Sequence, residues 1–481
     1  MKRGVALASG AVVVVSLFAA VRAHAAGCQG RPTDPAGFQS YSYGADVVKA
    51  FAGAKVSVHY ATTGPNAVDP ASTRGDGVPD TVALAADVGD KALAKYAEMG
   101  FKAPPSDASC ASNGGDGKLD VYLVAFNGAD GTTIPEACTG RACSSFVLAE
   151  STFKGRGYPT IAEGFQTVVA HELFHAVQNA YDSQLDRFWA EGTAQWAMKN
   201  VFPQLVDFEQ ALPAFFAEPA RSLDTQPAGV TAGYLYGSAV WPLFLTLRHG
   251  PDTVRAILEA EADGTKSLVA ADAVLLTKGS SIAEDYPLFG AWNAATKTLA
   301  GTGGYPDAAK YPGVKVAALA DGVTAISSGL GYFAYRGSLG ADASISLETD
   351  AARNAAVAVP IGGGKPDLAR AVMLPANVAA GDVLVVVAGI TTKKTDAPFT
   401  LHLGAPDPGM ASSSSGDAGA SSSSSSSSGA SGSSSGSSSG GCAIAAGGEG
   451  APARERYASF GALGIAIAAI ASCVMRRRPR S

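Results

Sequence analysis

The feature that most limits what this chain can fold into is a low-complexity tract near its end. Residues 411–441 are almost entirely Ser, Gly and Ala, which cannot bury a hydrophobic core. We therefore expect a flexible, solvated linker there and a folded part that lies before it. The whole chain of 481 residues is 47% hydrophobic and 16% charged, which supplies apolar material for one large or two ordinary cores.

The first 25 residues have the parts of a signal peptide in the expected order. Lys2 and Arg3 precede an apolar stretch over residues 5–21, and an Ala-His-Ala sequence ending at Ala25 fits signal peptidase cleavage. A lipoprotein signal with Cys28 as the lipidated residue is the alternative, although position 25 is Ala rather than Leu. Both interpretations predict an exported protein.

A second set of features follows the linker. Cys442 is followed by an apolar run over residues 458–475 and then by an Arg-rich end. The run has about the minimum length of a membrane span, and the arginines would keep that end on the cytoplasmic side. Residues 442–481 resemble the C-terminal sorting signals of myxobacterial surface proteins (MYXO-CTERM tails). The resemblance implies a sorting or processing enzyme as a partner and a location at the cell surface or outer membrane, or secretion once the tail is processed. A simple single-pass membrane anchor is the alternative.

The chain has six cysteines, of which Cys442 and Cys473 lie in the C-terminal tail. The other four belong to the folded part, and four cysteines allow three pairings. The short spacing of Cys138 and Cys143 favours a small disulfide loop, which leaves Cys28 to pair with Cys110. A four-cysteine metal site is the alternative, but disulfides are more common in an oxidising compartment.

Hydrophobic patterns predict an α+β unit followed by an all-β unit. Strands are expected at residues 55–63, 119–126 and 144–150, and helices at residues 80–100, 160–182, 189–201, 237–249, 252–260 and 282–299. Short β-rich runs after residue 310 predict a small accessory β-sandwich. The expected boundaries are residues 26–150 and 151–305 for the two parts of the α+β domain and 310–405 for the sandwich.

The helical pattern at residues 160–182 contains the sequence HELFH, from His171 to His175. Two histidines four residues apart on a helix face the same side and can bind one zinc ion. Glu172 would lie beside the metal and take a proton from a water molecule there. Glu191 is the natural third ligand, because no His or Cys occurs within about twenty residues after His175. A carboxylate favoured by the positive end of a helix is its alternative role.

The sequence HELFHAVQNAY, followed by WAEGTAQW and YLYGSAVWPLFLTLRHG, resembles a group of secreted metalloproteases in the gluzincin superfamily. The resemblance covers about residues 56–249. It implies a zincin-like α+β fold in which His171, His175 and Glu191 bind zinc and Glu172 is the general base. By gluzincin architecture, the strand at residues 144–150 would be the sheet edge that binds an extended substrate.

Two tyrosines are candidates for stabilising the oxyanion of peptide hydrolysis. Tyr236, and with less support Tyr234, follow the third ligand and could donate a phenolic hydrogen bond. Packing against the helix that begins near Gly237 is the alternative role of both.

Gly-rich turns with alternating carboxylates suggest Ca²⁺ as an additional ion. Asp76 and Asp80 lie in one such turn, and Asp116 and Asp120 in another. Neither turn has the full EF-hand ligand set, and Asp-Gly pairs are also ordinary turn residues, which is the favoured interpretation.

The sequence thus predicts a zinc-dependent metalloendopeptidase that hydrolyses a protein or peptide substrate outside the cell. Two alternatives remain: a surface adhesion or binding protein with a non-catalytic zinc site, and a zinc hydrolase of a non-peptide cell-wall bond. The presence of Glu172 argues against a purely structural site, which needs no base. With a net charge of −6 and no basic stripe, a nucleic-acid partner is not expected.

Overall fold

The computed structural model describes residues 27–408 apart from residues 127 and 228. The expected signal peptide (1–25), linker (411–441) and C-terminal tail (442–481) lie outside the described residues. In the described part, no helix has both the length and the apolar character needed to cross a membrane.

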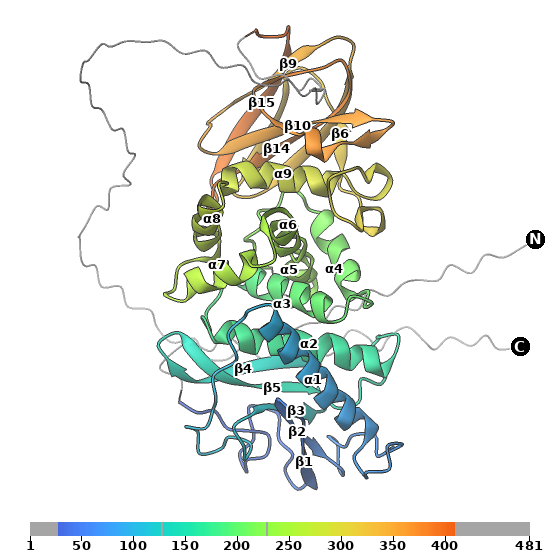
Figure 1. Cartoon of the computed structure of the whole chain (residues 1–481), viewed down its shortest axis with the longest axis vertical. Coiled ribbons are helices and arrows are strands. Elements are labelled where there is room, and N and C mark those ends of the chain that lie inside the picture. Colours follow the sequence, from blue (N-terminus) through green and yellow to red (C-terminus); the bar gives the residue numbers. More distant parts are fainter. Residues whose placement is uncertain (1–26, 127, 228, 409–481) are drawn as a thin grey trace, which may run out of the picture. The chain divides into compact units, whose positions relative to one another are not determined.

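A five-stranded mixed sheet forms the N-terminal part (Figure 1). Its strands, in spatial order, are β1 (Val48–Ala52), β2 (Val56–Ala61), β3 (Leu119–Val124), β5 (Ala142–Glu150) and β4 (Gly131–Thr139). The central strands β2, β3 and β5 are parallel and buried along almost their whole length, whereas the edge strands β1 and β4 are antiparallel to their neighbours. The three strands expected from the sequence are therefore confirmed, and β1 and β4 were not predicted.

Two long helices, α1 (Asp80–Glu98) and α2 (Ile161–Asn179), confirm the helices expected at residues 80–100 and 160–182. The two helices pack against each other, and α2 also packs against β4 and β5 (Figure 1). The side chain of Thr160 caps α2 by accepting a hydrogen bond from the backbone N–H of Glu163 at 3.1 Å. The apolar side chains of α2 are thereby fixed over one face of the sheet, where they form the main core.

The opposite face of the sheet is covered by residues 27–47, here called the N-terminal arm. Phe38 and Tyr43 of the arm pack in a second core with side chains of β3 and β5. The guanidinium group of Arg31 is fully buried against the ring of Phe146. Its nitrogens lie 2.5–3.1 Å from three carboxylates, those of Asp107, Asp120 and Glu136. The arm is therefore an integral layer of this part of the fold.

A helical layer follows the sheet in the chain. Its helices are α3 (Arg187–Val201), α4 (Asp207–Phe216), α5 (Gly233–Gly237), α6 (Val240–His249), α7 (Thr253–Glu261), α8 (Ser267–Thr277) and α9 (Ile282–Ala294). The expected helices at residues 189–201, 252–260 and 282–299 correspond to α3, α7 and α9, although α9 ends earlier. The helix expected at residues 237–249 begins later, at Val240, because the preceding residues form the separate short helix α5.

Two further sheets pack face to face after residue 310. The first contains β11 (Lys365–Pro366), β10 (Asn354–Gly362), β14 (Gly381–Gly389), β8 (Tyr332–Leu339) and β6 (Val316–Ala318), with β12 (Val372–Met373) paired to β10; the second contains β13 (Ala376–Val378), β9 (Ala343–Thr349), β15 (Asp396–Gly404) and β7 (Val323–Ser328). Side chains from both sheets, among them Tyr335, Val385, Ile345 and Phe399, share one core. The outer face of the first sheet packs on α9, so this β part also shares the main core with the helices.

Candidate metal centre

Helix α2 places His171, Glu172 and His175 in the interior of the protein. The exposed fractions of these residues are 1%, 0% and 2%. Polar side chains are costly to bury without partners. The HELFH sequence therefore requires a set of compensating contacts around it.

The third side chain of the cluster comes from α3. Oε2 of Glu191 lies 3.2 Å from Nε2 of His171 and 3.6 Å from Nε2 of His175, and the two Nε2 atoms are 3.1 Å apart. The three ligand atoms lie within 4.8 Å of one another, and no other group of three His, Cys, Asp or Glu side chains between residues 27 and 408 meets this criterion.

The glycine after Glu191 has a clear packing role. A Cβ atom on Gly192 would lie 2.7 Å from Oγ of Ser238, which closely follows α5. The same hydroxyl lies 2.9 Å from the carbonyl oxygen of Phe188 and 2.6 Å from that of Leu235, so the first turn of α3 and α5 meet at Ser238. Glycine thus permits the close approach that holds Glu191 towards α2.

The electrostatics of the cluster favour a bound cation. Burial alone would raise the pKa of Glu191, but hydrogen bonds from His171 and His175 lower it to about 2. Burial opposes a charge on His175, yet the Glu191 carboxylate outweighs this effect and raises the pKa of His175 to about 9. Oε1 of Glu191 is buried and has no hydrogen-bond partner in the described part of the chain. Two imidazoles and one carboxylate form a donor set that Zn²⁺ accepts, so these residues fit zinc.

The carboxylate of Glu172 is held by the sheet edge. Oγ1 of Thr133 on β4 lies 2.8 Å from Oε2 of Glu172 and 2.7 Å from the Glu172 carbonyl oxygen. A Cβ atom on Gly131 would lie 2.5 Å from Cγ1 of Val168 and 2.9 Å from Cγ of Glu172, so glycine allows β4 to approach α2 this closely. Burial is the main cause that raises the pKa of Glu172.

The two candidate tyrosines differ in their surroundings. The ring of Tyr236 lies beside the imidazole of His171, with 5.7 Å between the ring centroids. The hydroxyl of Tyr234 is instead 3.1 Å from the carbonyl oxygens of both Arg221 and Ser222. Tyr236 therefore stays a candidate for the site, whereas Tyr234 has the packing role.

The prediction that the strand at residues 144–150 forms the substrate-binding edge of the sheet is wrong. The strand expected at residues 144–150 is β5, which pairs with β3 on one side and β4 on the other. Its backbone groups are therefore already used within the sheet. The edge is β4, because the β4–β5 hairpin places its first strand on the outside.

The carboxylates suggested for Ca²⁺ bind protein groups. Oδ1 atoms of Asp76, Asp80 and Asp116 accept backbone N–H groups at 2.9 Å. Asp120 is paired with Arg31 and with His59. These contacts favour the interpretation as turn and core residues.

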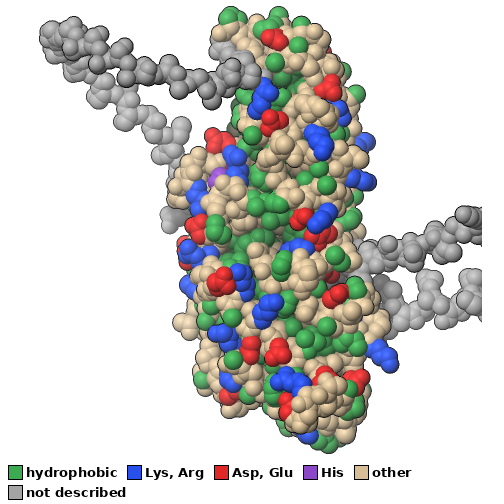
Figure 2. All heavy atoms as spheres, turned by 45° about the vertical axis from the view of Figure 1, so that its right-hand side comes forward, with side chains coloured by type: hydrophobic (Ala, Val, Ile, Leu, Met, Phe, Trp, Pro, Cys, Tyr) green, Lys and Arg blue, Asp and Glu red, His purple; other side chains and the backbone are tan. Residues whose placement is uncertain are grey.

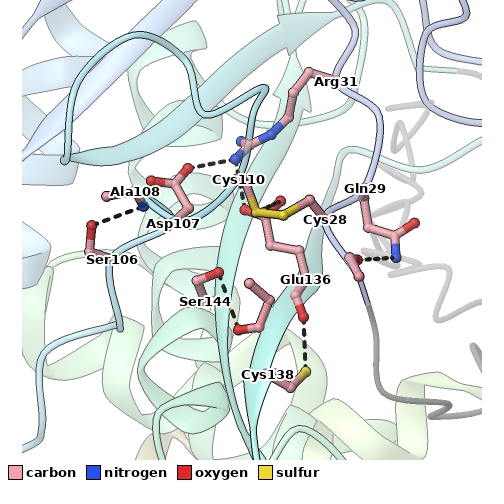
Figure 3. Close-up of a disulfide and its surroundings, with 12 residues drawn as sticks. Cys28, Gln29, Arg31, Ser106, Asp107, Ala108, Cys110, Glu136, Cys138 and Ser144 are labelled. Atoms are coloured by element: carbon pink, nitrogen blue, oxygen red, sulfur yellow. Dashed lines mark hydrogen bonds and ion pairs between the residues drawn. A yellow bond between two sulfur atoms is a disulfide. The ribbon is translucent and has the colours of Figure 1, made fainter.

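The cysteines are paired as their spacing suggested. Cys28 is bonded to Cys110 and Cys138 to Cys143. Figure 3 shows the first disulfide close to Arg31, Asp107 and Glu136, where the arm meets the sheet. This pairing leaves none of the four sulfurs as a thiol for a four-cysteine metal site, and the Cys28 sulfur is not free for a lipid.

Sequence reasoning did not identify Thr133, Gln178 and Gln195. The amide oxygens of Gln178 and Gln195 lie 2.7 Å and 3.2 Å from Nδ1 of His175 and His171. The spacing of Gln178 from His175 and of Gln195 from Glu191, three and four residues along a helix, was a usable signal. No comparable signal marks Thr133, which reaches Glu172 only through the tertiary fold.

No known protein family matches this chain, and no curated protein matches it either. The residues and their geometry therefore carry the functional assignment.

Proposed function

We propose that this protein is an exported zinc metallopeptidase with its centre at His171, His175, Glu191 and Glu172. One observation carries the proposal: two imidazoles and a carboxylate converge on one point, with a second buried carboxylate on the same helix. Three protein ligands would leave a coordination position open, which is the pattern of catalytic rather than structural zinc sites.

Zinc, when bound, would polarise the scissile carbonyl group and acidify a neighbouring water molecule. Glu172 would accept the proton of this water as its oxygen adds to the carbonyl carbon. The same carboxyl group would then give the proton to the amine nitrogen as the C–N bond breaks. Thr133 would keep the Glu172 carboxylate in one orientation, and Tyr236 would donate a hydrogen bond to the oxyanion.

The substrate would add to the outer edge of β4 as an extended strand. The residues from Gly131 to Ile134 pair regularly with β5 and lie next to Glu172. Pro135 has no N–H group, and the register with β5 shifts between Pro135 and Cys138. The usable edge is therefore short, and we expect recognition of only a few substrate residues.

A substrate can reach these four buried residues only if the residues that cover them move. The four central residues are at most 2% exposed. This closure favours a second candidate function, a surface protein whose zinc site is not catalytic.

The location outside the cell rests on the N-terminal and C-terminal signals in the sequence. The two disulfides support an oxidising compartment. Figure 2 shows acidic and basic side chains interspersed on the face in view, which gives no support to a nucleic-acid partner.

The deciding experiment measures metal content and casein hydrolysis of the purified protein, for the wild type, for Glu172→Gln and for a control variant. Glu98→Gln is a suitable control, because this side chain is 71% exposed at the end of α1. We expect one zinc per chain in all three proteins and hydrolysis by the wild type and the control only. Zinc in all three without hydrolysis of casein or of peptide libraries would favour the non-catalytic candidate. A folded wild type that binds no zinc would contradict both.

A further inference from the structure

Both histidines of the centre have their second ring nitrogen on a glutamine amide. Nδ1 of His175 lies 2.7 Å from Oε1 of Gln178, and Nδ1 of His171 lies 3.2 Å from Oε1 of Gln195. Both glutamines are 2% exposed. Gln178 lies on α2 and Gln195 on α3, so each of the two helices contributes one amide.

The orientation of the Gln178 amide follows from its other contacts. Nε2 of Gln178 lies 2.8 Å from the carbonyl oxygen of Ala190 and 2.7 Å from Oγ1 of Thr193. A carbonyl oxygen can only accept a hydrogen bond, so the NH₂ end of the amide must face Ala190. The oxygen end therefore faces His175, and the ring must carry its proton on Nδ1 to donate to it.

The same reasoning applies to the Gln195 amide, whose NH₂ group contacts a carboxylate and not a backbone carbonyl group. Nε2 of Gln195 lies 2.5 Å from Oδ2 of Asp207, in the first turn of α4. Burial raises the pKa of Asp207, and the hydrogen bond from Gln195 lowers it. The ionised carboxylate only accepts, so Oε1 of Gln195 then faces His171 and again requires a proton on Nδ1. A carboxylate is also favoured at this end of a helix, which helps to fix Asp207.

We propose that Gln178 and Gln195 are positioning residues that hold both imidazoles as Nδ1–H tautomers, with both Nε2 lone pairs directed at the metal position. The inference rests on the proposed metal centre. A neutral imidazole has one N–H and one acceptor nitrogen, so a proton fixed on Nδ1 leaves Nε2 as the ligand atom. Partners of this kind fix ring orientation and raise ligand basicity, and their loss typically costs about 10–100-fold in metal affinity.

The two amides also connect the helices that carry the ligands. Gln178 reaches from α2 to Ala190 and Thr193, which flank Glu191 on α3. Gln195 reaches from α3 back to His171 on α2. These contacts fix the position of His171 and His175 on α2 relative to Glu191 on α3. The groups that orient the two amides differ. The Gln178 amide is oriented by Ala190 and Thr193 on α3, whereas the Gln195 amide is oriented by Asp207 on α4.

The first test is the zinc dissociation constant, measured by competition with a chromophoric chelator. We expect Gln195→Ala and Gln178→Ala to bind zinc about 10–100-fold more weakly than the wild type. Gln204→Ala is the matched control, because this glutamine is exposed and its side chain donates a hydrogen bond to Gln166, away from the metal ligands. Thermal unfolding of the metal-free proteins separates loss of affinity from loss of fold.

A rescue experiment tests the orientation argument. Asp207→Leu alone removes the acceptor that orients the Gln195 amide, so zinc binding weakens. The double variant Gln195→Glu/Asp207→Asn restores the chain of donors and acceptors, because the new carboxylate accepts from His171 and the new amide donates to that carboxylate. We expect the double variant to bind zinc more tightly than Gln195→Ala and than Asp207→Leu.

A readout independent of zinc is the tautomer state in the metal-free protein, from ¹⁵N spectra of histidine-labelled material recorded above pH 9. At lower pH the His175 ring, whose pKa is raised to about 9, carries a proton on both nitrogens. The chain has only six histidines, so the signals can be assigned by single replacements. We expect Nδ1–H forms for His171 and His175 in the wild type and a change for His171 alone in Gln195→Ala. Unchanged tautomers together with unchanged zinc affinity in Gln195→Ala would overturn the inference. A wild type that shows these tautomers but binds no zinc would instead contradict the proposed function.

Discussion

At the scale of single residues, Thr133 connects the sheet to the proposed base. Its hydroxyl lies within hydrogen-bond distance of both the carbonyl oxygen and a carboxylate oxygen of Glu172. Glu172 is fully buried, so this contact limits the orientations that its carboxylate can adopt. A buried base that must accept and return a proton depends on such a fixed orientation.

The replacement Thr133→Val tests this role. Valine keeps the shape of threonine but cannot donate, so Glu172 loses a hydrogen bond of about 1.5–3 kcal/mol. We expect zinc content to be unchanged and kcat for peptide hydrolysis to fall by roughly 10–100-fold. The control is Thr132→Val, because neighbouring side chains on a strand point to opposite faces. Equal kcat values for the two variants would show that the contact has no catalytic role.

The site residues differ in how far the sequence could predict them. His171, Glu172 and His175 share one helical turn, and Glu191 lies in the next amphipathic segment, so local spacing was sufficient. Thr133 is 39 residues from Glu172 along the chain and approaches it only because α2 packs on β4. Contacts of that kind depend on the tertiary arrangement, which hydrophobic patterns do not specify.

At the scale of elements, α3 is held from both sides. Gly192 allows its close approach to Ser238, and Nε1 of Trp189 donates to Oε2 of Glu261 on α7 at 2.9 Å. Glu261 is fully buried, and burial is the main cause that raises its pKa from 4.5 to about 8, with Asp186 and Asp182 adding to the effect. The α3–α7 contact is thus sensitive to pH.

The pKa of Glu261 predicts a stability that declines with pH. The folded-state pKa lies above the ordinary value of 4.5, so the stabilisation is fully present below that value and is lost as pH rises towards 8. Between pH 5 and 8 the loss has an upper limit of about 4 kcal/mol, at roughly 1.4 kcal/mol per pH unit. Glu261→Gln keeps an acceptor for Trp189 and should remove this part of the slope in denaturant unfolding. Glu259→Gln, on the same helix but paired with Arg255 at the surface, should keep the wild-type slope. Parallel slopes for all three proteins would contradict the assignment.

Physical reasons explain why the sequence patterns did not predict strand β4. β4 has the sequence GTTIPEACT, in which polar residues and Pro135 hide a strand, yet a proline is tolerated on an edge. The same omission made β5 look like the edge, because its outer neighbour was absent from the expected sheet. The long helix α1 was predictable, since its buried residues recur at helical spacing. Helices α2 and α3 are buried on almost every side, so their length, and not a one-sided stripe, distinguishes them from strands.

At the scale of the whole molecule, the described parts share cores instead of standing alone. The N-terminal arm closes one face of the first sheet through the disulfide between Cys28 and Cys110 and the buried ion pairs of Arg31. Removing Arg31 would leave three carboxylates buried together, which is strongly unfavourable. The arm is therefore built into the fold and is not a detachable segment.

The β part is joined to the helices in a comparable way, through Gly290 on α9. A Cβ atom at this position would lie 2.8 Å from Cγ1 of Val386 and 3.0 Å from Cγ of Tyr332, both on the first sheet of the sandwich. Helix propensity alone predicts that Gly290→Ala stabilises the protein by about 1 kcal/mol. The close packing predicts the opposite, a loss of about 1–3 kcal/mol, because valine and tyrosine must shift in a dense core.

Thermal and denaturant unfolding of Gly290→Ala decides between these effects and tests whether the parts unfold together. We expect one cooperative transition in the wild type and one transition at lower temperature in the variant, since α9 belongs to the same core as the sandwich sheet. Gly340→Ala is the control, because nothing lies within 4 Å of a Cβ atom there. Two transitions, of which only one moves, would mean that the β part is an independent domain beside the metal centre. A single shifted transition would mean that a substitution in the sandwich interface also changes the stability of the helices that hold His171, His175 and Glu191.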